Sequence, residues 1–117
     1  MKILLIVNDA PYGNEKLYNA LRLAMTLQRE HAAVELRMFL MADSLGSALT
    51  GQSTPNGYYN IERMMKAVIK DGGQIKACGS CARARGIKQL DIIDGIEISN
   101  MKQLTQWVVD SDKVINF

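Results

Sequence analysis

The chain has 117 residues, enough for one domain with a small hydrophobic core. The net charge is only +2 and acidic residues are interleaved with basic ones, so no direct nucleic-acid partner is expected. No apolar run approaches the roughly eighteen residues that span a bilayer, and residues 3–7 are too short an apolar run for a signal peptide. We therefore expect a cytoplasmic protein with no membrane association.

The first half of the chain predicts two strands, one helix and a long connection. Residues 3–7 form an unbroken apolar run that predicts a strand buried on both faces. Apolar residues at three-four spacing then predict a helix: Leu17, Ala20, Leu21, Ala24 and Leu27. Residues 34–41 predict a second strand. Residues 43–60 are rich in Ser, Thr and Gly, so they predict a connection, with a helical turn near 45–49, that could cover a site as a lid.

The second half alternates in the same way. An apolar stripe predicts a helix that Gly72 and Gly73 end: Ile61, Met64, Met65, Val68 and Ile69. The following predicted elements are a strand at 75–78, a short helix ended by Gly86, a strand at 95–98, a helix begun by Asn100 and Gln103, and a strand at 113–117. Strands alternating with helices predict one α/β domain over residues 1–117, a three-layer α/β/α arrangement with a five-stranded, mostly parallel sheet, flavodoxin-like and doubly wound.

The two cysteines, Cys78 and Cys81, are the strongest candidates for chemistry. Cys78 falls where the third strand becomes a helix, and sites of parallel sheets lie at the carboxyl ends of strands. Backbone N–H groups at the start of a helix and nearby cations stabilise a thiolate, so Cys78 is expected to be a nucleophile. The residues expected to stabilise the thiolate or bind substrate are Asn8, Gly79, Ser80, Arg83 and Arg85.

Other interpretations of the cysteines stay open. Cys78 could be a small apolar residue that ends a buried strand, and Cys81 could be the resolving thiol of a C-x-x-C pair or a packing residue. A zinc site needs about four ligands, and His31 is the single histidine, so no metal is expected in one chain. Neither G-x-G-x-x-G nor a Walker motif follows Gly13, so no cofactor is expected.

Three stretches carry a resemblance to a known family: "KILLIVNDAPYG", "NIERMMKAVIKDGGQIKACGSCARARGI" and "QWVVDSDKVINF". The chain resembles the DsrE/DsrF-like family, close to its YchN-type branch. The most specific match is Cys78, eight residues before the glycine of the pair Arg85-Gly86. The resemblance implies the same three-layer fold, assembly as a homo-oligomer (trimer or hexamer), and sulfur relay. In such relays the cysteine receives sulfane sulfur from a sulfur-donor protein as a persulfide and passes it to a sulfur-acceptor protein.

Cys81 departs from the single-cysteine relay subunits, because a second thiol one helical turn away could attack a persulfide on Cys78. Three functions are therefore carried forward. They are a sulfurtransferase or sulfur carrier that uses Cys78, a dithiol redox protein that uses both cysteines, and a non-catalytic oligomeric binding module.

Overall fold

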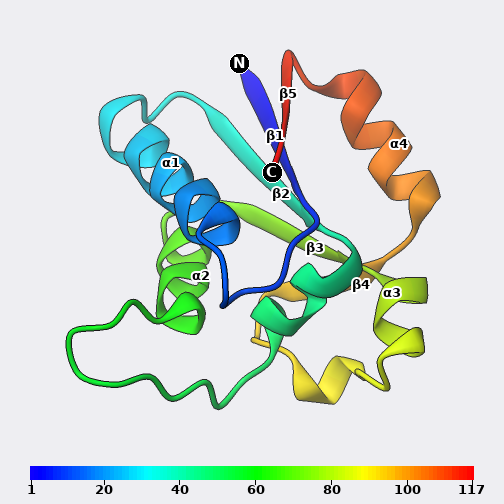
Figure 1. The fold of residues 1–117 in the computed structure, drawn as a ribbon. Helices are drawn as coiled ribbons and strands as arrows, with labels where there is room; N and C mark the ends of the chain where they lie inside the picture. The colour runs from blue at the N-terminus through cyan, green and yellow to red at the C-terminus, as the bar shows by residue number, and fades with distance from the viewer.

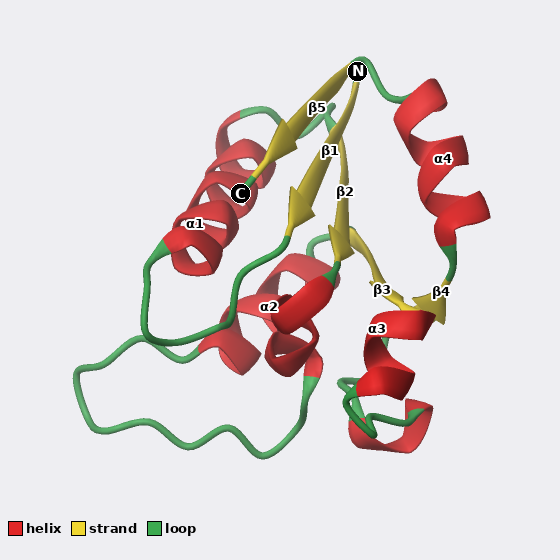
Figure 2. Ribbon diagram, turned by 45° about the vertical axis from the view of Figure 1, so that its right-hand side comes forward, coloured by secondary structure: helices red, strands yellow, loops and turns green.

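The computed structural model describes all 117 residues, and its centre is one parallel sheet (Figures 1 and 2). The strands are β1 (Lys2–Val7), β2 (Glu35–Leu40), β3 (Gln74–Cys78), β4 (Ile96–Ser99) and β5 (Lys113–Asn116). Their order is β4-β3-β2-β1-β5, and every neighbouring pair is parallel. The predicted five-stranded α/β sheet is confirmed.

The strand order differs from the 2-1-3-4-5 order of flavodoxin. From β1 to β4, each new strand is added beside the previous one, as is usual for strands that follow each other in the chain. Only the last connection crosses the sheet and places β5 on the free side of β1. The carboxyl ends of β1 and β3 are consequently separated by β2.

Three long helices form the outer layers. Helices α1 (Lys16–Glu30) and α2 (Ile61–Lys70) pack together on one face, and α4 (Met101–Asp110) lies on the other (Figure 1). Crossovers between parallel strands are right-handed, so the reversed direction of the last connection places its helix on the opposite face. The predicted three layers are confirmed.

Side chains of β2 and β3 fix α4 to the sheet. The Trp107 ring packs edge-on against Phe39, with 6.3 Å between the ring centroids. The Arg37 guanidinium and the Lys76 ammonium lie 5.5 Å and 4.8 Å from the centre of the same ring. Arg37 also pairs with Asp110 at 2.8 Å. Because side chains alternate along a strand, the contact of Lys76 with α4 means that position 78 also faces the α4 side.

The prediction that residues 43–60 form a lid is partly wrong. The 3₁₀ helix η1 (Ala42–Ala48) begins directly after β2, earlier than the expected turn at 45–49, and Ser44, Leu45, Ser47 and Ala48 are all buried. The Ser44 hydroxyl donates to the Val7 carbonyl at 2.8 Å, which ties η1 to the end of β1. The first part of the segment 43–60 is therefore core rather than a cover.

Element boundaries differ from the expectation by a residue or two. The fourth strand begins at Ile96 because Gly95 has a φ of +98°, a left-handed conformation that does not continue a strand. The helix after Cys78, α3 (Gly79–Ala84), ends before Gly86, whose φ is +67°. A further short 3₁₀ helix, η2 (Gln89–Asp91), was not predicted. None of the helices is long and apolar enough to cross a membrane.

Candidate functional site

Cys78 is the last residue of β3 and also caps α3. Its side chain is 5% exposed, and its Sγ accepts a hydrogen bond from the Cys81 backbone N–H at 3.4 Å. The Ser80 hydroxyl lies 3.3 Å from the same sulfur and is itself on the surface. The thiol thus lies just below the surface, at the carboxyl end of the sheet, as the sequence predicts.

Opposing effects act on the pKa of Cys78. Burial raises the pKa, because a thiolate is poorly solvated inside the protein. Hydrogen bonds from the Cys81 thiol, the Ser80 hydroxyl and the backbone N–H groups of both residues lower it and outweigh burial. The net result is a Cys78 pKa below its ordinary value, so the thiolate is more populated near neutral pH than in a free cysteine.

The pKa of Cys81 shifts in the opposite direction. Burial and the hydrogen bond to Cys78 raise the pKa of Cys81, and the backbone N–H of Ala42, 3.2 Å from Sγ, offsets only part of this. Cys81 therefore remains a thiol at pH values where Cys78 is already ionised, and its S–H stabilises the neighbouring thiolate. The environments of the two cysteines therefore shift their pKa values in opposite directions.

Two arginines follow the cysteines on α3, and they have different positions. Arg85 pairs with Asp43 of η1 at 2.7 Å and donates to the Cys81 carbonyl at 3.0 Å, so it joins η1 to α3. Its charge lowers the pKa of Cys81. Arg83 lies beside Gly79, where an added Cβ would come within 3.2 Å of the guanidinium.

The chain turns sharply between β2 and η1, at Ala42. Its φ of 51° lies in the left-handed region, which is uncommon for a residue with a side chain. The N–H of Ala42 is the group that contacts Cys81. This unusual corner is therefore part of the environment of the second thiol.

The structure does not bring Asn8 into contact with the cysteines. Its side chain donates to the Phe117 carbonyl at 3.4 Å, beside β5. Since β2 lies between β1 and β3, the ends of these strands are about 10 Å apart at the usual strand spacing. The carboxyl edge was predicted correctly, but the strand order that separates Asn8 from Cys78 could not be obtained from the sequence pattern.

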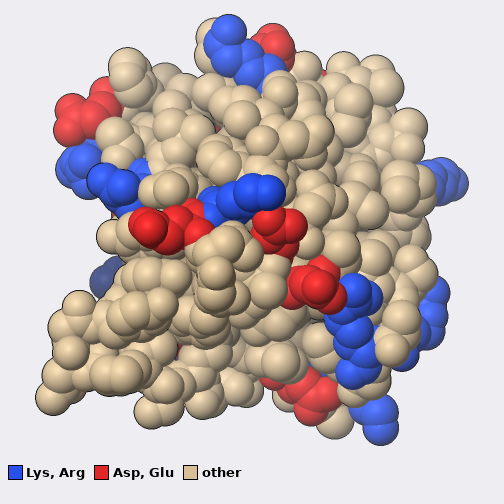
Figure 3. Space-filling model, in the orientation of Figure 1, with Lys and Arg blue, Asp and Glu red and all other residues tan.

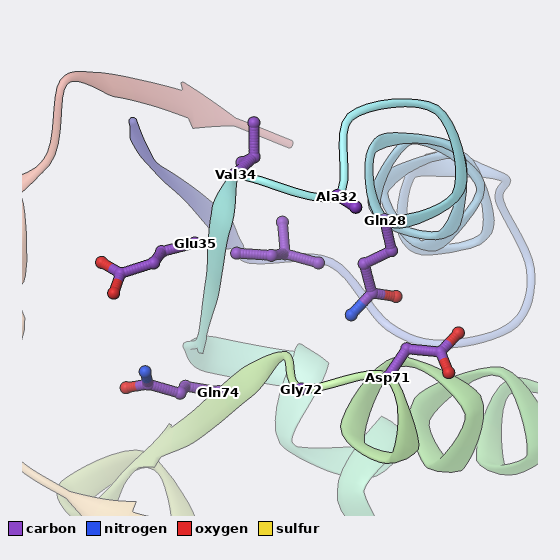
Figure 4. A pocket seen from close by; sticks show the side chains of 8 residues that line it. Gln28, Ala32, Val34, Glu35, Asp71, Gly72 and Gln74 are labelled. Carbon is purple, nitrogen blue, oxygen red and sulfur yellow. The ribbon is translucent and has the colours of Figure 1, made fainter.

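The hollows of the surface lie away from the two cysteines. One of 310 Å³ opens between the amino ends of β2 and β3, near Gln28, Glu35 and Gln74 (Figure 4). Four residues of extended strand, about 13 Å, separate Gln74 from Cys78. Neither this hollow nor the other two includes a cysteine, so the thiol site is shallow. No three histidine, cysteine or carboxylate side chains come together as a metal site.

Sequence reasoning missed three residues near the thiols: Ala42, Asp43 and Ser99. Ala42 and Asp43 come from a segment about forty residues earlier in the chain, and Ser99 is the register partner of Cys78 on β4. No local pattern points to them, because their proximity depends on strand pairing.

The fold and site define a parallel α/β protein with a buried, hydrogen-bonded thiol at a strand end. The model of the DsrE/DsrF-like family matches residues 1–117, and the chain belongs to this family. It is 41% identical over 116 residues to protein YchN of Escherichia coli K12, covering 99% of this chain and 98% of that protein. It is 38% identical over 115 residues to an uncharacterised protein of Methanopyrus kandleri, covering 98% of this chain and 93% of that protein.

Solved structures show the same similarity to YchN. The crystal structure of YchN from E. coli superposes with a TM-score of 0.94 and 41% identity, covering 100% of this chain and 99% of that one. A protein of unknown function from Methanobacterium thermoautotrophicum superposes with a TM-score of 0.81 at 11% identity, covering 99% of this chain and 98% of that one. The second similarity concerns the fold alone.

Proposed function

We propose that this protein is a sulfur-relay protein, a sulfurtransferase whose Cys78 carries sulfane sulfur as a persulfide. The observation that carries the proposal is the contrast between the two thiols: the pKa of Cys78 is lowered by hydrogen bonds from Ser80 and Cys81, and that of Cys81 is raised. A thiolate is the nucleophile in sulfur chemistry, so only Cys78 is prepared for attack near neutral pH. Membership of the DsrE/DsrF-like family supports this role.

The proposed step begins when the Cys78 thiolate attacks the sulfane sulfur of a donor persulfide, R–S–SH. A new S–S bond forms at Cys78, the old S–S bond breaks, and R–S⁻ leaves with the electron pair. Cys78 then holds S–SH, which ionises to S–S⁻. An acceptor thiolate removes the outer sulfur by the same exchange, and the Cys78 thiolate is regenerated.

The shape of the site favours sulfur that arrives on another protein. No hollow of the surface contains Cys78, so little of a small donor could be enclosed there. The thiol is nevertheless just below the surface, beside exposed Ser80. A sulfur-donor or sulfur-acceptor protein that presents its own cysteine on a protruding segment would fit this shallow site.

A dithiol redox function is the second candidate, because the hydrogen bonds between Cys78 and Cys81 place the two sulfurs side by side. In that reaction an oxidant would remove two electrons and two protons, and a disulfide would join the cysteines. The raised pKa of Cys81 makes this pair slow to react near neutral pH.

Intact mass spectrometry tests the proposed function. Reduced protein is incubated with glutathione persulfide, and its mass is then measured under non-reducing conditions. We expect a gain of one sulfur atom, which peptide mapping locates at Cys78. A loss of two hydrogens with neither sulfur gain nor release of sulfide would support the redox function instead, and an unchanged mass would contradict both.

We also expect a homo-oligomer, a trimer or a hexamer. Residues 50–60 carry no charged side chain and include exposed Tyr58, and the surface over this loop, at the lower left of Figure 3, is free of charge. On α4, Val109 is 78% exposed. Interfaces are depleted in charge and enriched in tyrosine. Sedimentation at micromolar concentration should give a mass well above the 13.0 kDa of one chain, and a 13.0 kDa particle would contradict the expectation.

A further inference from the structure

Ser99 lies beside the nucleophile on the neighbouring strand. It is the last residue of β4, and its Cα is the register partner of Cys78. Paired residues of parallel strands point to the same face and lie about 4.8 Å apart. Ser99 and Cys78 are therefore neighbours at the carboxyl edge of the sheet, on the side that faces α4.

The Ser99 hydroxyl has no hydrogen-bond partner. Its oxygen is inaccessible to solvent and forms no bond to the Cys78 sulfur or to any other group. A buried hydroxyl without a partner destabilises a protein, and most such groups in folded proteins are paired. The Ser99 hydroxyl is thus a hydrogen-bond donor that the resting thiol leaves unused.

The start of α3 lies against the backbone of Ser99. At Gly79, an added Cβ would lie 2.8 Å from the Ser99 carbonyl oxygen and 3.4 Å from Ile98. The backbone of α3 therefore approaches the end of β4 closely, which a larger residue at position 79 would prevent. The expected role of Gly79 is accordingly steric, because it lets α3 begin close to the end of β4.

We propose that the Ser99 hydroxyl is the hydrogen-bond donor to the outer sulfur of the Cys78 persulfide. The proposal rests on the proposed function. A persulfide extends the side chain by one S–S bond, about 2.05 Å, which moves the anionic sulfur away from the position occupied by Sγ. The Ser80 hydroxyl already lies 3.3 Å from the sulfur of the resting thiol, whereas the Ser99 hydroxyl has no partner and can donate to the added sulfur.

In this proposal Ser99 is a positioning residue that acts only when Cys78 carries a persulfide. An interaction present in the persulfide and absent in the thiolate shifts the loading equilibrium toward the persulfide. Ser80 acts on the resting thiolate, whose pKa it lowers. The two serines therefore provide a matched pair for the test.

The test measures the loading equilibrium of Cys78 at fixed ratios of glutathione persulfide to glutathione, by intact mass. A Cys81→Ser background prevents disulfide formation. We expect Ser99→Ala to lower the loading constant about fivefold, the usual effect of one hydrogen bond. Ser99→Thr retains a hydroxyl and should restore loading. The pH profile of Cys78 alkylation should move to higher pH in Ser80→Ala and stay in place in Ser99→Ala.

The outcomes separate the two proposals. If the parent protein loads sulfur and Ser99→Ala loads it equally well, the role of Ser99 is wrong and the sulfur relay stands. If Ser99→Thr loads as poorly as Ser99→Ala, or if Ser99→Ala shifts the alkylation profile, the hydroxyl does not act on the outer sulfur. If the parent protein itself takes up no sulfur, the sulfur-relay function fails.

Discussion

The substitution Cys78→Ser is expected to lower the rate of sulfur uptake about a thousandfold or more. It removes the nucleophile on which the persulfide forms. A serine hydroxyl is almost fully protonated near neutral pH and cannot attack sulfane sulfur. Intact mass after incubation with glutathione persulfide, followed over time, provides the measurement.

The same substitution should leave the fold intact. Cys78 occupies the N-cap of α3 and accepts a hydrogen bond from the Cys81 N–H. Serine is among the preferred N-cap residues, so its hydroxyl can accept this bond. We expect an unchanged circular dichroism spectrum and a Tm equal to or above that of the parent. Cys81→Ser is the matched control and should retain uptake; sulfur uptake by the Cys78→Ser protein at the parental rate would refute the assignment of the nucleophile.

Cys81→Ser is expected to slow the release of sulfide from the loaded protein. In the parent, the Cys81 thiolate attacks the inner sulfur of the Cys78 persulfide, a disulfide forms, and HS⁻ leaves. The attack needs the Cys81 thiolate and a protonated Cys78 persulfide, because HS⁻ leaves only from S–SH. The first fraction grows and the second falls as the pH rises, so release through Cys81 should depend only weakly on pH between the two pKa values.

The Cys81→Ser protein should release sulfide more slowly than the parent at every pH, because serine cannot attack the persulfide. Release of sulfide is followed with a sulfide electrode between pH 6 and pH 11, and the disulfide is identified by intact mass. Equal release rates in the two proteins at every pH would show that Cys81 is a packing residue.

Much of the fold could be predicted because its signals are local. The apolar run at 3–7 is β1, and the stripe from Ile61 to Ile69 lies within α2, since burial on both faces of a strand or one face of a helix leaves a periodic pattern. Cys78 was placed correctly for the same reason: it ends an apolar run and precedes a helix. The identity of η1 was only partly predicted, because a short 3₁₀ helix with two buried serines leaves little apolar pattern.

The rest of the site depends on which strands are neighbours. Asn8 and Cys78 both follow strands, but β2 separates those strands, whereas Ser99 adjoins Cys78 because β4 pairs with β3. Likewise, Arg85 was expected to act on Cys78, but Asp43 and the Cys81 carbonyl hold it beside the second thiol. Such contacts arise from long-range pairing, which the spacing of residues along one chain does not specify.

Alkylation of the two thiols tests most directly whether Cys78 is the thiolate and Cys81 its protonated neighbour. Alkylation with a small excess of iodoacetamide, stopped at short times between pH 6 and pH 10 and resolved by peptide mass, measures each thiol separately. We expect Cys78 to be modified first, and its rate to rise at a lower pH than that of Cys81, because their pKa values are shifted in opposite directions. Equal rates at every pH, or earlier modification of Cys81, would contradict the assignment of Cys78 as the thiolate.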